Sequence, residues 1–116
     1  MITIIAGTRN LCDPDLIYDA IKACGWVPTE VVSGGCHGVD QAGEEWARAH
    51  GVPVRVFPAN WSLHGRAAGP MRNRTMAGYA EALLAIWDGT SRGTKNMIDE
   101  AKTSGLRIHV YHSAKP

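Results

Sequence analysis

The sequence predicts an α/β fold, a single Rossmann-like three-layer domain with a mostly parallel five-stranded sheet. Short apolar runs alternate along the chain with segments whose apolar residues recur at helical spacing. The run ALLAIW at 82–87 is continuously apolar, which is typical of a strand covered on both faces. Because strand, helix and strand repeat regularly, crossover connections should place helices on both faces of a parallel sheet.

The elements follow in order from local signals. Residues 2–6 form the first expected strand, and Asp13-Pro14 begins a helix because Asp is a favourable N-cap and Pro fits the first turn. Apolar residues at helical spacing then lead to Gly25, a plausible C-cap. Further strands are expected at 30–33, 54–57, 82–87 and 107–111, and further helices at 39–50, 70–79 and 94–104. The segment before residue 70 reads as a long loop, and the tail 112–116 should fray.

The composition indicates one domain of an ordinary soluble protein. The chain has 116 residues, 45% of them hydrophobic and 20% charged. The formal net charge of +1 gives no global field for attracting DNA or an anionic membrane, so anion binding must be local. The start MITIIAG has no basic flank and is too short for a signal peptide or a membrane span. We expect a cytoplasmic location.

Cysteine and histidine give no sign of a metal site. The three cysteines (Cys12, Cys24 and Cys36) lie far apart without a C-x-x-C, so buried free thiols are expected rather than disulfides or a zinc knuckle. The histidines lack metal-ligand spacing. No G-x-S-x-G elbow is present. We expect neither a metal nor a resident cofactor.

Ligands of open parallel sheets bind beyond the carboxyl ends of the strands, which directs attention to the loops after each strand. These loops are GTRN, SGGCHG, FPANWSLHGRAAG and WDGTSRGT. They are rich in glycine and also carry Arg9, Arg66 and Arg92. Packing alone is a poor explanation for glycine and arginine gathered at one end of a sheet.

The motif SGGCHGVD, residues 33–40, has two interpretations. Its glycines permit close approach of backbone amides to a phosphate at a helix N-terminus, but a tight turn with Asp40 as a cap would need the same residues. The motif is not G-x-G-x-x-G and follows the second strand, so it is a poor match to a dinucleotide fingerprint. His37 in this loop could contact a ligand or act as an acid or base.

Two later motifs also allow anion binding. DGTSRGTKN at 88–96 fails the Walker A spacing but remains a glycine-rich, hydroxyl-rich loop before a helix. MRNRTM at 71–76 carries either a solvated basic face or an arginine fork for a phosphate or carboxylate. Trp61, expected in a loop, could stack on a base, whereas the three other tryptophans, Trp26, Trp46 and Trp87, suit packing.

These motifs, in the order GTR at 7–9, SGGCHGVD, FPANW at 57–61, MRN at 71–73 and DGTSRGT at 88–94, resemble the SLOG superfamily, and most closely its short YspA-like branch. The resemblance implies a Rossmann-like sheet that binds nucleotides at its carboxyl edge, often in homo-oligomers. In the related phosphoribohydrolases an Arg-Lys pair precedes a Gly-Thr motif and a catalytic glutamate. Arg72 and Gly93-Thr94 match, but Asn73 replaces the lysine, and the glutamate positions fall on Asn96 and Met97. Whether the chain is an enzyme therefore stays open.

We expect the chain to bind a nucleotide-derived small molecule, such as ADP-ribose, NAD, a nucleoside phosphate or a cyclic nucleotide, as a sensor or as a phage-type sponge for an immune signal. The alternative is a hydrolase that cleaves a base–ribose or phosphate bond. DNA binding is disfavoured by the near-zero net charge and by the lack of a basic stripe interleaved with aromatic residues. The expected ligand-binding residues are Gly7, Thr8, Arg9, Gly34, Gly35, His37, Gly38, Asp40, Trp61, Arg72, Asn73, Asp88, Gly89, Thr90, Arg92, Gly93 and Thr94.

Overall fold

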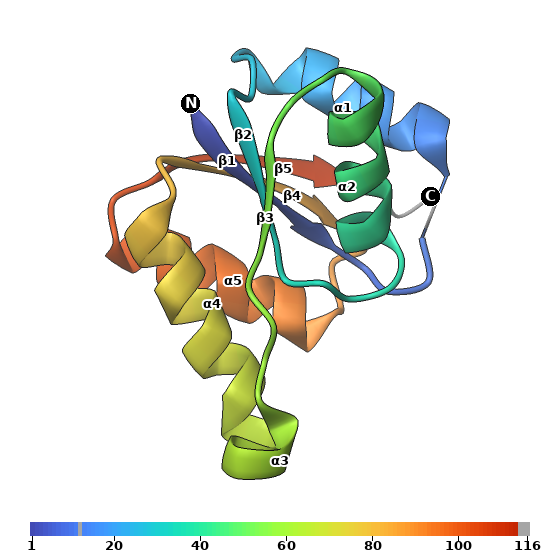
Figure 1. Cartoon of the computed structure of the whole chain (residues 1–116). Helices are drawn as coiled ribbons and strands as arrows, with labels where there is room; N and C mark the ends of the chain where they lie inside the picture. Colours follow the sequence, from blue (N-terminus) through green and yellow to red (C-terminus); the bar gives the residue numbers. More distant parts are fainter. Residues whose placement is uncertain (12, 114–116) are drawn as a thin grey trace.

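A computed structural model describes residues 1–11 and 13–113 of the chain (Figure 1). The elements are β1 (Ile2–Gly7), α1 (Pro14–Cys24), β2 (Glu30–Ser33), α2 (Val39–Ala49), β3 (Val54–Val56), α3 (Trp61–His64), the 3-10 turn η1 (Gly65–Ala67), α4 (Ala68–Tyr79), β4 (Ala82–Trp87), α5 (Arg92–Thr103) and β5 (Arg107–His112). Cys12, expected as a buried free thiol, and residues 114–116 of the tail expected to fray lie outside the described residues.

The five strands form one sheet in the order β3-β2-β1-β4-β5, and all four pairs are parallel. The α/β Rossmann-like expectation is confirmed, and the sheet is parallel throughout rather than mostly parallel. Because β2 and β3 extend on one side of β1 while β4 and β5 extend on the other, the strand order reverses at β1. Crevices for ligands open at such a reversal, beyond the carboxyl ends of the strands.

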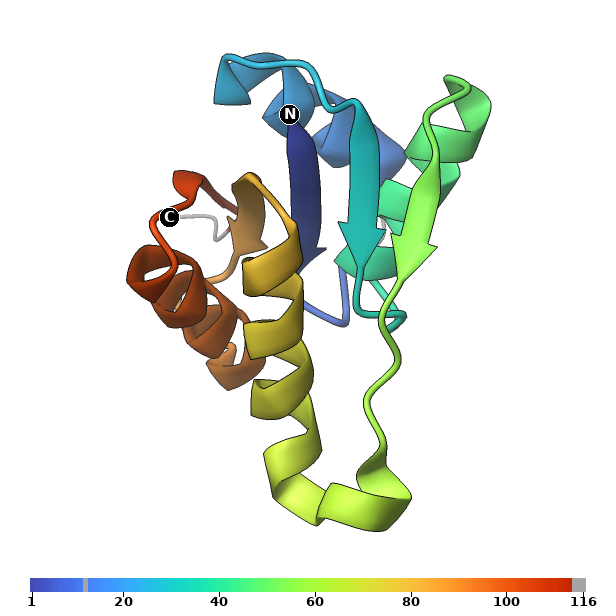
Figure 2. The ribbon, with the colours of Figure 1, turned by 60° about the vertical axis from the view of Figure 1, so that its left-hand side comes forward.

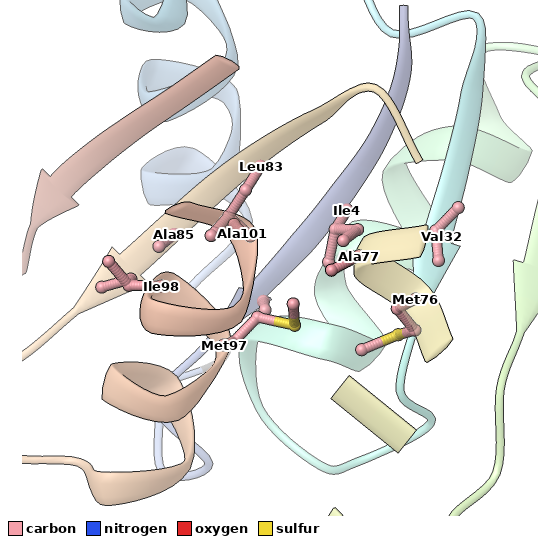
Figure 3. Packing of buried hydrophobic residues seen from close by; sticks show 10 residues of the cluster. Ile4, Val32, Met76, Ala77, Leu83, Ala85, Met97, Ile98 and Ala101 are labelled. Carbon is pink, nitrogen blue, oxygen red and sulfur yellow. The ribbon is translucent and has the colours of Figure 1, made fainter. Parts of the chain in front are cut away.

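Helices cover both faces of the sheet, and each face has its own core. Alternate side chains of a strand point to opposite faces, so Ile4 and Leu83 pack under α4 and α5 while Ile5 and Leu84 pack under α1 and α2. Figure 3 shows the first of these clusters, with Met76 from α4 and Met97 from α5 beside the sheet. Because helices pack on both faces, the loops at the carboxyl edge of the sheet start from a rigid base.

The helix ends follow the expected capping chemistry at α1. The Asp13 carboxylate accepts a hydrogen bond of 3.0 Å from the Asp15 amide, with Pro14 in the first turn. Gly25 takes the left-handed conformation, with φ 89°, that ends many helices. Among the described residues, no helix has both the length and the apolar character needed to cross a membrane.

The segment expected to be a long loop is partly helical. The Asn60 side chain caps α3 by accepting a hydrogen bond of 3.1 Å from the Leu63 amide, so Trp61 begins a short helix and does not lie in a loop. Further along, α4 begins at Ala68, two residues before its expected start. Figure 2 shows this segment extending beyond the carboxyl ends of β1, β2 and β3, with α3 at its far end.

Several other boundaries differ by one or two residues from the expectation: β1 ends at Gly7, α2 at Ala49, β3 at Val56 and α5 at Thr103. Helix α5 begins at Arg92 rather than at Thr94, and β5 extends to His112 rather than ending at Tyr111. The β5 extension follows from register, because Trp87 of β4 pairs with His112 and its carbonyl then accepts a hydrogen bond of 2.9 Å from the Ser113 amide. The expected fraying therefore does not include His112 and Ser113.

Candidate functional site

A cavity of about 350 Å³ lies at the carboxyl edge of the sheet. The end of β1, the loop between β2 and α2, and the helices α3, α4 and α5 all contribute to its wall. This is the edge at which ligands of parallel sheets bind. The lining residues are Ala6, Gly7, Arg9, Cys36, Asp40, Trp61, Gly69, Pro70, Arg72, Asn73, Met76, Ser91, Arg92, Gly93, Thr94, Asn96 and Met97.

The cavity brings together about half of the residues that the sequence singled out. Those in its wall are Gly7, Arg9, Asp40, Trp61, Arg72, Asn73, Arg92, Gly93 and Thr94. Those outside its wall are Thr8, Gly34, Gly35, His37, Gly38, Asp88, Gly89 and Thr90. The second group lies in the loops that follow β1, β2 and β4, beside the wall.

Arg72 of α4 joins several parts of the site. Its Nη1 donates a hydrogen bond of 2.6 Å to the carbonyl of Gly34 and contacts the carbonyl of Phe57 at 3.5 Å. Its Nε donates at 2.9 Å to Oδ1 of Asn73, and its Nη2 lies 4.0 Å from Sγ of Cys36. The guanidinium is half-buried and held by acceptors, so it presents a fixed positive charge at the cavity wall.

Asp40 is the acidic group of the cavity, and only 6% of the residue is exposed. Its Oδ2 accepts a hydrogen bond of 3.3 Å from the Cys36 amide. Burial raises the pKa of the Asp40 carboxyl to about 6, against the smaller opposing effects of the Cys36 amide and the Arg72 charge. A carboxyl with this pKa can gain or lose a proton near neutral pH, which a surface aspartate cannot do.

Asn73 connects α4 to α5 at the cavity wall. Its Nδ2 donates a hydrogen bond of 2.9 Å to Oδ1 of Asn96 and contacts the Gly93 carbonyl at 3.4 Å, while its Oδ1 accepts from Arg72. Only 6% of Asn73 is exposed. All of the polar groups of this buried amide are therefore engaged, as a buried amide requires.

Two amides of the SGGCHG loop donate hydrogen bonds within the protein. The Gly35 amide donates a hydrogen bond of 3.0 Å to the Ser33 hydroxyl, and the Cys36 amide donates to Asp40. Gly38 has φ 79°, and a Cβ there would lie 2.2 Å from the carbonyl oxygen of Arg9, so this position requires glycine. The loop contacts the loop after β1 and forms one wall of the cavity.

Two further predicted residues sit beside that wall. His37 is exposed and lies outside the cavity lining. The Thr8 hydroxyl is buried and has no hydrogen-bond partner among the residues that the structure describes. Its backbone carbonyl accepts hydrogen bonds from Leu11 and Val39, which fixes the loop after β1 against the start of α2.

The N-terminus of α5 opens onto the cavity. Oδ1 of Asp88 accepts hydrogen bonds from the amides of Thr90 and Ser91 at 2.9 and 2.8 Å, and these amides lower the pKa of the carboxyl. The first helical bond runs from Lys95 to the Ser91 carbonyl, so the amides before Lys95 precede the helical ladder. A Cβ on Gly93 would meet nothing within 4 Å, which leaves the backbone there accessible.

Trp61 closes the far side of the cavity. Its ring lies over the backbone of α4 at Gly69, where an added Cβ would be 3.1 Å from Cη2 of the indole. The side chain is 49% exposed, so one face of the ring packs while part of it remains in contact with solvent. Arg9 and Arg92 are exposed lining residues, which places two more positive charges around the cavity.

The family model that matches this sequence is that of the YspA, cpYpsA-related SLOG family, over residues 1–64, which is more than half of the chain. The chain belongs to the SLOG family. It is also 34% identical over 117 residues to the gene 61 protein of Mycobacterium phage D29, an alignment that covers 90% of this chain and 91% of the phage protein. No solved structure matches the chain.

The SLOG-family region defined by that model supplies only part of the cavity. Residues 1–64 include Arg9, Cys36, Asp40 and Trp61, whereas the wall formed by α4 and α5 lies beyond residue 64. The alignment with the phage protein extends over most of both chains and so reaches this second part.

Sequence reasoning did not select several lining residues of this SLOG-family site. Met76 and Met97 belong to apolar stripes, and nothing in the stripes distinguishes a cavity floor from an ordinary core. Ser91 lies inside the glycine-rich motif at 88–96, of which other members were predicted to bind ligand. The most informative omission is Asn96. Its hydrogen bond to Asn73, seen only in the structure, shows that it belongs to the site. The full set that was missed is Ala6, Cys36, Gly69, Pro70, Met76, Ser91, Asn96 and Met97.

The cysteine expectation holds in part. Cys24 is a buried free thiol, as expected. Cys36 is free but half-buried, because its loop forms the cavity wall and leaves the side chain in contact with the open volume. Within residues 1–11 and 13–113 of this SLOG-family chain, no group of three histidine, cysteine or acidic side chains is arranged to hold a metal ion.

Proposed function

We propose that this SLOG-family chain binds a nucleotide-derived small molecule in the cavity at the carboxyl edge of the sheet. One observation carries the proposal: Arg9, Arg72 and Arg92 surround a single cavity that also contains the buried carboxyl of Asp40 and the ring of Trp61. The volume of about 350 Å³ is within the range of small-molecule sites, about 300–1,000 Å³. ADP-ribose, NAD, nucleoside phosphates and cyclic nucleotides all combine the groups that such a wall would recognise.

The phosphate is assigned to the N-terminus of α5. Backbone amides and the helix dipole favour an anion there, and Arg92 adds a full positive charge. Ser91, the N-cap residue, makes no side-chain capping hydrogen bond, so its side chain does not compete for those amides. Arg9 and Arg72 supply further charge-assisted donors from the other walls.

The ribose and the base are assigned to the remaining polar and aromatic groups. Asp40 in its ionised form can accept hydrogen bonds from ribose hydroxyls. Trp61 offers a partly exposed ring, and stacking on an aromatic ring tolerates any base. This assignment predicts broad binding of related nucleotides rather than strict selection of one base.

The biological role that fits is sensing or sequestration. The gene 61 protein, to which this chain is similar over most of its length, comes from a phage. Phages benefit from a protein that removes a host immune signal, and such a sponge needs tight binding without turnover. We also retain the predictions of a homo-oligomer and of weak or no binding to DNA, each of which a light-scattering or salt-dependent binding measurement would check.

The test uses the purified chain and a panel of nucleotides and cyclic dinucleotides. After incubation, mass spectrometry is applied to the supernatant and to the material released by denaturing the protein. Intact ligand found only after denaturation supports sequestration. Absence of both retained ligand and new products contradicts the proposal.

Substitutions of cavity arginines, each with a matched control, test whether the ligand binds in the cavity. Arg72→Ala and Arg92→Ala should each weaken binding at least tenfold, because each removes a charged donor from the wall. The control for Arg72 is Arg74→Ala, since the side chain of Arg74 is 78% exposed on the same helix and pairs with Glu100. The control for Arg92 is Lys95→Ala, whose side chain is 63% exposed and pairs with Asp99. Equal affinity of all four variants would show that the ligand does not bind in this cavity.

One observation favours hydrolysis as a second function. Asp40 is a cavity carboxyl with a pKa of about 6, and general acids and bases work best when their pKa lies near the operating pH. Cleavage of a base–ribose bond would release a free base and a ribose phosphate into the supernatant. Those products should disappear in Asp40→Asn if the carboxyl takes part, whereas retention of intact ligand by both proteins would exclude turnover.

A further inference from the structure

Three polar side chains form a continuous hydrogen-bonded chain along the wall that α4 and α5 share. Arg72 Nε donates to Oδ1 of Asn73 at 2.9 Å, and Nδ2 of Asn73 donates to Oδ1 of Asn96 at 2.9 Å. All three residues line the cavity. Asn96 is half-buried and ends the chain on the second turn of α5.

The two partners of the Asn73 side chain determine which way its amide group is turned. A guanidinium carries only donors, so the Asn73 atom that faces Arg72 Nε must be the oxygen. A backbone carbonyl only accepts, and Nδ2 of Asn73 lies 3.4 Å from the carbonyl of Gly93. Two independent partners therefore orient the same amide.

The orientation of Asn73 determines that of Asn96. Because Asn73 presents its amino group to α5, Asn96 must present its oxygen in return. The amino group of Asn96 is then directed away from this contact, on a residue that lines the cavity. The bond to Asn73 thus occupies one lone pair of the Asn96 oxygen and leaves both N–H groups of the Asn96 amide to donate.

We propose that Asn96 is a specificity-determining hydrogen-bond donor that recognises an oxygen acceptor of the bound ligand, either on a phosphoryl group or on the ribose. This inference rests on the proposed nucleotide function and deepens it. Arg9, Arg72 and Arg92 already make the wall rich in donors, and Asn96 extends that character one turn along α5. The cavity therefore selects ligands that present oxygen acceptors to α5 and rejects those that present donors there.

The decisive variant is Asn96→Asp. The carboxylate keeps an oxygen for Nδ2 of Asn73, so the hydrogen-bonded chain with Arg72 stays intact, but it cannot donate to a ligand. Asn96→Ala removes the donor without adding a charge and so separates loss of donation from simple repulsion. Asn60→Asp is the control for the added charge, because aspartate caps a helix as well as asparagine does and α3 should be preserved.

The probes are AMP, ADP-ribose and adenosine, with binding measured by isothermal titration calorimetry. We expect Asn96→Asp to weaken the binding of AMP and ADP-ribose at least tenfold and Asn96→Ala to weaken it at least fivefold, with Asn60→Asp within twofold of the unaltered chain. Loss for AMP but not for adenosine would assign the oxygen to the phosphoryl group, and equal loss for both would assign it to the nucleoside.

Two results would overturn the inference, and they differ. Unaltered affinity of Asn96→Ala, whatever the effect of Asn96→Asp, would show that Asn96 donates nothing to the ligand while leaving the proposed function in place. No binding of any of the three probes by the unaltered chain would reject the proposed function for these ligands and the inference with it. Circular dichroism of each variant establishes that the fold is retained before affinities are compared.

Discussion

Nη1 of Arg72 lies 2.6 Å from the carbonyl oxygen of Gly34, which ties the middle of α4 to the residue that follows β2. The contact places a positive charge where two elements far apart in the sequence meet. It also explains the glycine, because a Cβ at position 34 would lie 2.6 Å from Nη1 and 3.0 Å from Oδ2 of Asp40. Gly34 thus allows the guanidinium to approach the loop closely.

Gly34→Ala should therefore move the Arg72 guanidinium and break its hydrogen bond to the loop. The displaced atoms are the end of a flexible side chain, so the fold should persist, but loss of a charge-assisted bond should cost about 1.5–3 kcal/mol in the free energy of unfolding. Nucleotide binding should fall at the same time. Urea unfolding and calorimetry would measure the two effects.

Gly78→Ala is the control for that substitution. Gly78 lies in α4, and a Cβ there would meet nothing within 4 Å. Alanine is a better helix former than glycine, so this variant should gain about 0.5–1 kcal/mol of stability. If Gly34→Ala behaved like Gly78→Ala, the close approach of Arg72 would have no energetic importance.

Asn73→Ala should be among the more destabilising single changes in the site. The substitution leaves Arg72 Nε and the Gly93 carbonyl without their partner and removes the link to α5. Because Asn73 is buried, we expect a loss of about 2 kcal/mol in the free energy of unfolding. Asn96→Ala removes only the half-buried end of the hydrogen-bonded chain and should cost less. Equal costs for the two variants would contradict the importance of the Asn73 contacts.

The fold could be predicted from the sequence because local signals agreed with the global arrangement. The continuous apolar run of β4 indicated a buried parallel strand, and Asp13-Pro14 marked a helix start that the structure confirms. The helical segment α3 was missed since it has only one turn. Its cap, Asn60, gives a weak signal when no apolar periodicity follows.

The location of the site could be predicted from the sequence, but the hydrogen bonds within it could not. Parallel-sheet topology located the edge, and glycine and arginine located the loops. The sequence could not show that the Gly35 and Cys36 amides donate to side chains at the end of β2 and the start of α2, because that depends on where Ser33 and Asp40 point. Asn96 shows the same limit, since its role follows from a partner 23 residues earlier in the chain.

Trp61→Ala should reduce the binding of a base without greatly reducing stability. The ring is 49% exposed, so its removal costs less packing than removal of a buried tryptophan would. A base stacked on it should lose about 1–3 kcal/mol of binding free energy. Calorimetry with AMP and with ribose 5-phosphate separates the effects, because only AMP carries a base.

Leu63→Ala is the control for the tryptophan variant. Leu63 belongs to the same short helix, is 70% exposed and lies outside the cavity lining. Its replacement should leave both affinities unchanged. A loss of ribose 5-phosphate affinity in Trp61→Ala equal to the loss for AMP would mean that Trp61 shapes the cavity rather than covering a base.

Asp40→Asn should change the pH dependence of stability in a direction that the pKa determines. Burial raises the pKa of the folded-state carboxyl from an ordinary value of 3.8 to about 6. As the pH rises between these values, the unfolded chain releases this proton while the folded chain retains it, so Asp40 makes the protein progressively less stable. Below about pH 4 the penalty is absent, and above about pH 6 it is complete, at about 3 kcal/mol.

Asparagine cannot ionise and can still accept from the Cys36 amide, so the variant lacks the penalty. The free energy of unfolding of Asp40→Asn minus that of the unaltered chain should therefore increase between pH 4 and pH 6 and then stay level. Urea unfolding at half-unit steps from pH 4 to pH 8 measures this difference, in which the titrations of the other carboxyls cancel. Asp99→Asn, on an exposed residue paired with Lys95, controls for the loss of one negative charge. A difference for Asp40→Asn that is constant across this range would show that Asp40 titrates as an ordinary carboxyl and that burial does not hold its proton.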